Sequence, residues 1–209
     1  MGAPLVPSAQ AFATVDLLNS YLVDDISTSD PFALAALAAA TSAIQSYCDQ
    51  RIDFVDGDVV VVDGSGSDIL LLPEFPVTDV ASVVVDFDRD SARTLVPPGN
   101  GSNSEYDWNE AGMLIHRLGS TLMYTSPFNA TYGMWPNRRR SVQVTYSHGY
   151  ATVPAEIQLV CVAIAGRAIA QDGANSETIG SYTAQYAGQP ATLTDNEKRI
   201  LDRYRARRR

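Results

Sequence analysis

The sequence is poor in the residues from which disulfide, metal and catalytic sites are built. Its 209 residues include two cysteines and two histidines. No His-x-x-x-His, Cys-x-x-Cys or carboxylate–histidine metal spacing occurs. Two cysteines are too few for a disulfide framework. We therefore predict no catalytic residues, no metal ligands and no cofactor, and we expect Cys48 and Cys161 to be reduced, buried and close to each other.

Long hydrophobic runs are also missing. The longest apolar stretch, residues 32–40, falls well short of the roughly 20 residues that span a membrane. Residues 1–4 lack the basic and apolar regions of a signal peptide. Hydrophobic residues nevertheless make up 45% of the chain, which excludes wholesale disorder. The sequence predicts a folded, soluble protein made in a reducing cytoplasm, with no membrane partner.

Positive charge is scarce and confined to one part of the chain. Residues 1–110 carry 18 acids and 3 arginines, whereas residues 111–209 carry 6 acids and 12 bases, of which Lys198 is the single lysine. The last twelve residues hold seven bases and one acid, Asp202. A basic tail on an acidic protein indicates a surface for an acidic protein or for nucleic acid. The alternative is a solvated helix end whose arginines complement the helix dipole.

Helical signals appear at the beginning of the chain. Thr14 is a suitable N-cap for a short helix that reaches Leu22. Asp30 followed by Pro31 predicts the start of a longer helix that ends near Cys48. Its larger side chains form a narrow seam with steps of three and four residues, which suits a core helix or a helix between subunits equally well. The seam comprises Leu34, Leu37, Thr41, Ile44 and Cys48.

Helical signals return after residue 153. Pro154 lies near the first turn of a predicted helix that ends at Gly173. The segment that follows lacks any period, which indicates an extended or mobile loop. Thr194 and Glu197 then form a capping box for a last helix.

The region between these helical segments has the period of β-strands. Alternating or β-branched runs are bounded by Gly, Pro and Ser turns, as is typical of strands. They fall at residues 59–62, 69–72, 82–87, 106–108, 113–116 and 142–146.

These patterns predict an α+β protein, with a small bundle of about four helices and a β-rich subdomain inserted between the second and third helices. Residues 1–52 are expected to supply an N-terminal arm and two helices of the bundle, and residues 53–150 the inserted subdomain. Residues 151–209 are expected to supply the remaining helices, a loop over 173–192 and the basic tail.

Four segments together resemble a known family. They are Ile44–Arg51 (IQSYCDQR), Leu70–Val77 (LLLPEFPV), Val144–Tyr150 (VTYSHGY) and Glu177–Tyr186 (ETIGSYTAQY). Their order and spacing, over residues 14–205, resemble the head–tail connector, or head-completion adaptor, proteins of long-tailed bacteriophages. His148 departs from the small or polar residue expected at its position.

The resemblance implies a structural virion protein and no enzyme. Such adaptors form a ring, expected here to hold twelve copies, beneath the portal protein at the head–tail interface. They extend the DNA channel and offer a docking surface to the next head-completion or tail connector protein. Genomic DNA is expected to pass without specific binding, because acidic walls do not hold phosphates. The protein would be made in the bacterial host cytoplasm and assembled on the portal from largely monomeric chains.

The resemblance and the charge pattern together suggest interaction residues. The portal-docking residues are expected in a tail that is disordered before docking: Arg203, Tyr204, Arg205, Arg207, Arg208 and Arg209. Inter-subunit or loop contacts are expected from Ile179, Tyr182 and Tyr186.

Two alternatives remain open at this point. The first is a DNA-binding protein that uses residues 138–140 and the C-terminal arginines, although the chain is acidic overall and carries no recognised DNA-binding motif. The second is a hydrolase that uses His116 or His148 with a nearby acid.

Overall fold

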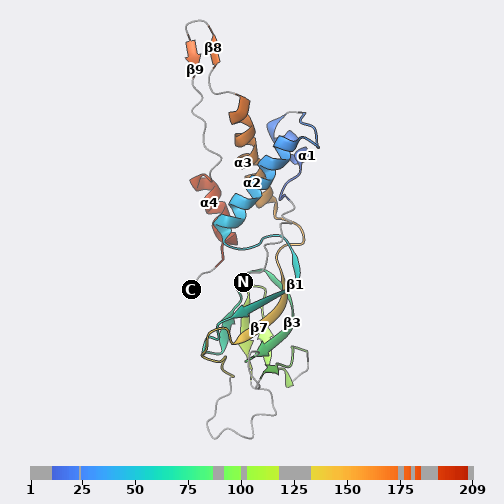
Figure 1. The fold of residues 1–209 in the computed structure, drawn as a ribbon, viewed down its shortest axis with the longest axis vertical. Coiled ribbons are helices and arrows are strands. Elements are labelled where there is room, and N and C mark those ends of the chain that lie inside the picture. The colour runs from blue at the N-terminus through green and yellow to red at the C-terminus, as the bar shows by residue number, and fades with distance from the viewer. Residues whose placement is uncertain are drawn as a thin grey trace. The chain divides into compact units, whose positions relative to one another are not determined.

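The structure is a computed structural model that describes residues 11–23, 25–86, 92–99, 103–117, 133–173, 177–179, 182–184 and 193–206. The chain divides into two compact units (Figure 1). The helical unit is built from the described residues up to Asp53 and from Ala151 to Arg205. The β unit is built on residues 54–150. Within the described residues, no helix combines the length and the hydropathy needed to cross a bilayer.

The helical unit contains four α-helices, and three of them begin at side-chain caps that were predicted. Thr14 caps α1, the Asp30 carboxylate accepts the N–H groups of Phe32 and Ala33 at the start of α2, and the Thr194–Glu197 capping box opens α4. The helices are α1 (Val15–Leu22), α2 (Pro31–Cys48), α3 (Ala155–Gly173) and α4 (Asp195–Leu201), and α4 continues into the 3-10 turn η3 (Asp202–Tyr204).

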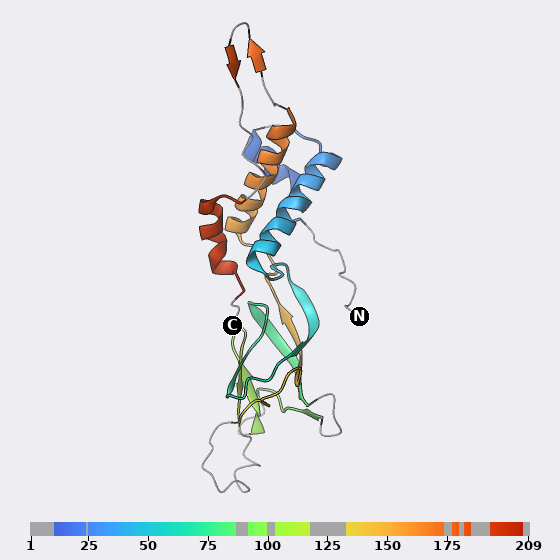
Figure 2. The same cartoon turned by 60° about the vertical axis from the view of Figure 1, so that its left-hand side comes forward.

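Helices α2 and α3 lie side by side and form the centre of this unit (Figure 2). Alanines let the two backbones approach closely, because Ala33, Ala36 and Ala40 fill the contact face of α2 with little volume. The Thr41 hydroxyl lies 3.7 Å from the Cys161 sulfur, in the buried seam. Of the predicted seam of α2, only Leu34 is exposed (47%), because the buried face is centred on the alanines one residue before it and two residues after it.

The two thiols are buried as predicted, but the expectation that they are neighbours is wrong. The Cys161 thiol donates to the Leu37 carbonyl, whereas Cys48 lies three turns further along α2 and donates to the Leu201 carbonyl. Three turns of helix separate two side chains by about 16 Å. Burial raises the pKa of the Cys48 thiol to about 12 and also raises that of Cys161.

The β unit consists of two antiparallel sheets over one apolar core. The first sheet has the strand order β1-β7-β3-β4, and the second has the order β2-β6-β5. Leu70 from the second sheet and Val83 and Val144 from the first belong to the same core. The strands are β1 (Val55–Val62), β2 (Ile69–Leu71), β3 (Val77–Val85), β4 (Arg93–Thr94), β5 (Tyr106–Trp108), β6 (Met113–His116) and β7 (Val142–His148).

This arrangement confirms the predicted fold class, with the β subdomain inserted between α2 and α3. The segment over 173–192 differs from the loop that was expected there, because it contains the paired strands β8 (Glu177–Ile179) and β9 (Tyr182–Ala184). The segment is polar and contains glycines, so no apolar alternation marks these two strands in the sequence.

Candidate interaction surfaces

The C-terminal segment is anchored to the helical unit by an ion pair. The Arg167 guanidinium on α3 donates to both oxygens of the Glu197 carboxylate on α4, at 2.8 and 3.0 Å. One of these oxygens also accepts the backbone N–H of Thr194 at 2.8 Å. Burial would raise the pKa of Glu197, but the bonds from Arg167 and Thr194 outweigh burial and hold the pKa below its usual range. The ion pair between Arg167 and Glu197 therefore attaches the capping box of α4 to α3, at the centre of the helical unit.

Residues 202–205 continue this attachment. The Tyr47 hydroxyl donates to the Asp202 carboxylate at 2.7 Å, and the Gln50 amide donates to the Tyr204 carbonyl at 2.6 Å. Arg203 and the Tyr204 hydroxyl both donate to the Glu156 carboxylate, at 2.8 and 3.1 Å.

The expectation of a disordered tail is therefore wrong for residues 202–205. Their partners, Tyr47, Gln50 and Glu156, lie far away in the sequence, so the local pattern could not show them. The Arg205 guanidinium lies 5.4 Å from the centre of the Tyr47 ring, a cation–π distance. Arg207, Arg208 and Arg209, also predicted to dock on the portal, lie outside the described residues.

Arg203 and Arg205 remain exposed while they make these contacts. The side chains of Arg203 and Glu156 are 67% and 46% exposed, so their ion pair contributes at most about 1 kcal/mol.

The residues predicted for inter-subunit or loop contacts are described only in part. Ile179 and Tyr182 are register partners at the end of the β8–β9 pair. Tyr186 lies outside the described residues. The contacts of these residues with other subunits remain a prediction.

Large apolar side chains are exposed at the start of the chain, and of these only Leu34 belongs to the seam that was expected to lie in the core or between subunits. Leu17, Tyr21 and Val23 are exposed on α1 and at its end, and Phe32 and Leu34 are exposed on the first turn of α2. We call these five residues the α1–α2 apolar set. Contiguous exposed apolar patches typically mark interaction sites, whereas single exposed apolar side chains are normal.

Neither histidine shows an arrangement typical of a hydrolase. His116 is buried, packs edge-on against Trp135 at 4.9 Å between ring centres, and has a pKa lowered chiefly by burial. His148 is fully buried, at the end of β7, between the Asp58 and Glu74 carboxylates. The nearby Ser147 hydroxyl donates to Asp56 instead, so it forms no serine–histidine pair with His148 in the structure.

The arginines at 138–140 support the DNA-binding alternative weakly. Arg138 donates to the Asp86 carboxylate at 2.8 Å, which neutralises it locally. The backbone N–H of Arg140 donates to Asp63 at 2.7 Å. Two exposed arginines, Arg139 and Arg140, remain beside these acids. Phosphate binding would have to overcome the repulsion of the neighbouring carboxylates.

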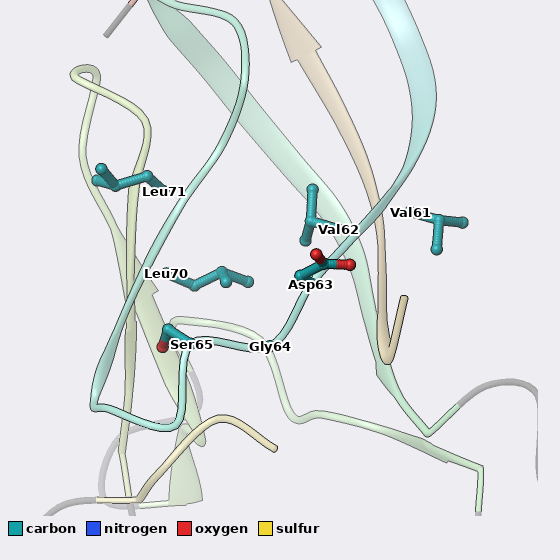
Figure 3. Close-up of a pocket in the computed structure, with 7 residues that line it drawn as sticks. All are labelled: Val61, Val62, Asp63, Gly64, Ser65, Leu70 and Leu71. Atoms are coloured by element: carbon teal, nitrogen blue, oxygen red, sulfur yellow. The ribbon is translucent and has the colours of Figure 1, made fainter. Parts of the chain in front are cut away.

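A hollow of about 620 Å³ lies in the β unit between the end of β1 and β2 (Figure 3). Its lining is mostly aliphatic and includes Val62, Leu70 and Leu71. Asp63 is its one titratable lining residue among those described, and its carboxylate already accepts the Arg140 N–H. Among the residues that the structure describes, its lining holds no set of groups suited to catalysis.

The fold is similar to that of a chain in a solved structure. A chain from the neck of a native gene transfer agent particle, computed with C12 symmetry, matches with a TM-score of 0.53 and 14% identity over 100% of this chain and 97% of that chain. A chain from the virion of a native gene transfer agent particle matches with a TM-score of 0.48 and 16% identity over 93% and 90% of the two chains. No curated protein sequence matches.

The family model described as head completion protein matches residues 11–207. The chain belongs to the head completion protein family. It is a structural head–tail connector of the virion, and its family is not a class of enzymes. The resemblance drawn from the four sequence segments is thereby confirmed.

Proposed function

We propose that this protein forms a ring of twelve copies beneath the portal, extends the DNA channel and presents a docking surface to the next head-completion or tail component. The observation that carries the proposal is membership of the head completion protein family over residues 11–207. The C12 symmetry with which the similar neck was computed supports twelve copies.

The α1–α2 apolar set is the proposed contact between neighbouring copies. Each side chain of Leu17, Phe32 and Leu34 is between 37% and 47% exposed in the isolated chain. Burying a large apolar side chain contributes roughly 1.5–3 kcal/mol when it is complete. Such a gain, repeated around a closed ring, supports assembly even when one pairwise contact is weak.

The C-terminal segment is the proposed portal contact. Arg203, Tyr204 and Arg205 stand on an ordered turn and keep their polar ends near the surface. Arginine and tyrosine are enriched among residues that dominate binding at interfaces. Arg207, Arg208 and Arg209 would extend this basic surface toward acidic groups on the portal. The chain as a whole carries a net charge of −9, which supports passage of DNA without specific binding.

Binding to purified portal rings tests this proposal. The protein is mixed with the portal of the same particle, and complexes are separated by sedimentation and imaged by electron microscopy. We expect density for a twelve-fold ring on the portal with wild-type protein, and much weaker binding for the double variant Arg203→Ala and Arg205→Ala. Arg51→Ala is the matched control, because it also removes an exposed arginine that is paired with an aspartate of the helical unit. Portal binding that is unchanged in the double variant would contradict the docking role of this segment.

The same preparation tests the DNA-binding alternative. A filter-binding assay at low salt should show weak binding of duplex DNA, and the double variant Arg139→Ala and Arg140→Ala should behave like wild type. Tight and steeply salt-dependent binding that this variant abolishes would favour the alternative.

A further inference from the structure

The apolar face of β7 ends in a histidine. Val142, Val144 and Tyr146 occupy alternate positions of β7 and are fully buried in the core of the β unit. His148 is the next residue on this face and is also fully buried. The Tyr146 and His148 rings lie 4.9 Å apart with an angle of 32° between their planes. The row of core residues on this face of β7 therefore ends in His148, whose side chain can ligate a metal.

Both strands beside β7 change register at this point. The register of β1 shifts between Val55 and Asp58, and that of β3 shifts between Val77 and Asp79. Val55 and Val77 are the two residues paired with His148. Bulges redirect side chains and are common near functional sites. Here the bulge of β1 precedes Asp58, whose carboxylate lies beside the imidazole.

Two carboxylates approach the two ring nitrogens. Asp58 Oδ2 lies 3.4 Å from His148 Nε2, and Glu74 Oε2 lies 3.0 Å from Nδ1. One donor atom from each of the three residues can be chosen so that all lie within 4.8 Å of one another. The Asp58 and Glu74 side chains are 39% and 22% exposed, so an ion can reach the group from solvent.

We propose that Asp58, Glu74 and His148 bind a divalent transition-metal ion, with Zn²⁺ as the best fit. Zinc accepts imidazole nitrogen and carboxylate oxygen at about 2.0–2.2 Å, which corresponds to roughly 3.4 Å between the ligands of a tetrahedral site. The described donor atoms lie up to 4.8 Å apart, so they need to close by up to about 1.4 Å, and the partly exposed carboxylates have the freedom to do so. Calcium and magnesium fit less well, because they prefer oxygen ligands alone.

The ion would join three separate segments of the β unit. Asp58 belongs to β1, Glu74 to the connection after β2, and His148 to the end of β7. Three protein ligands leave a further position for water or for a group from a neighbouring molecule. The site shares no residue with the ring and portal contacts proposed above.

A protonated histidine held between the two carboxylates without a metal is the competing state. This state has the same contacts, but both ring nitrogens carry protons, so neither nitrogen binds a metal ion. The chain has two histidines, so isotope labelling of histidine gives two sets of ring nitrogen signals, with His116 as an internal reference.

The experiment uses tag-free full-length protein, freed of metal by a chelator and titrated with Zn²⁺ at neutral pH. Calorimetry measures affinity and stoichiometry, and ¹⁵N spectra of the labelled histidine rings identify the ligand. We expect one ion per chain, binding at micromolar concentration, a large shift of one His148 nitrogen and no shift of His116.

The matched variants remove one charge each without changing side-chain size. Asp58→Asn and Glu74→Gln should each weaken zinc binding by about tenfold or more, whereas Glu110→Gln, an exposed glutamate of the same unit, should leave it unchanged. These carboxylates are partly exposed, so the variants should keep the fold, and an unchanged His116 signal verifies this. Absence of saturable binding, or zinc binding that leaves the His148 nitrogens unshifted, would overturn the proposal.

Discussion

The ion pair between Arg167 and Glu197 should contribute strongly to the stability of the helical unit. The side chains of Arg167 and Glu197 are 24% and 9% exposed, and both carboxylate oxygens accept bonds from the guanidinium. The substitution Glu197→Gln leaves the half-buried guanidinium of Arg167 without its counter-charge. Removing one partner of a buried pair costs about 3–5 kcal/mol, and partial exposure reduces this toward about 2–3 kcal/mol.

The stabilisation should depend on pH in a definite direction. The pKa of Glu197 is lowered in the folded protein, so its stabilisation is complete above the unfolded pKa of about 4.3 and is lost as the pH falls through the folded value. Urea unfolding followed by circular dichroism should therefore show a large difference between wild type and Glu197→Gln at pH 7. The difference should shrink as the pH falls below about 4.

Glu156→Gln is the matched control for this prediction. Glu156 also accepts bonds from an arginine, Arg203, but both side chains are well exposed. An exposed ion pair is worth at most about 1 kcal/mol. If Glu197→Gln and Glu156→Gln reduce the free energy of unfolding equally at pH 7, the argument that burial determines the strength of the Arg167 pair is refuted.

Three further predictions concern packing and assembly. Gly133→Ala should destabilise the β unit by about 1–3 kcal/mol, because its Cβ would overlap the buried His116 ring, and thermal unfolding that matches wild type would contradict this. Cys48 and Cys161 should react slowly with a thiol reagent near pH 7.5, since both are buried and burial raises their pKa values, whereas rapid labelling of the native protein would show that the helices open. Purified protein at micromolar concentration should be largely monomeric by size exclusion with light scattering, and a ring as the sole species would contradict assembly on the portal.

The helices could be predicted because their signals are local. The Thr14, Asp30 and Thr194 caps act within three residues of themselves, so the sequence shows them directly. The alternating pattern of β7 can likewise be recognised from neighbouring residues alone. Strand order could not be predicted in the same way, because β7 pairs with β1 and β3, which come from distant parts of the chain.

The candidate sites show the same limit. Asp58, Glu74 and His148 are separated by 16 and 74 residues, so no metal-binding spacing appears in the sequence. The order of residues 202–205 depends on Tyr47 and Glu156, and the charge pattern of the tail contains no trace of these partners. Leu34 has the same helical spacing as the buried residues of α2, but it is exposed because the buried face is centred on the nearby alanines.

The position of this chain in the assembled particle tests the central claim most directly. Electron cryomicroscopy of portal-bearing particles, prepared with the wild-type protein and with a deletion of the whole gene, should show a twelve-fold ring of this chain beneath the portal in the first case alone. The account predicts that particles without the ring leak DNA and carry no tails. Tailed, DNA-filled particles that form without this chain would contradict its role as a head–tail connector.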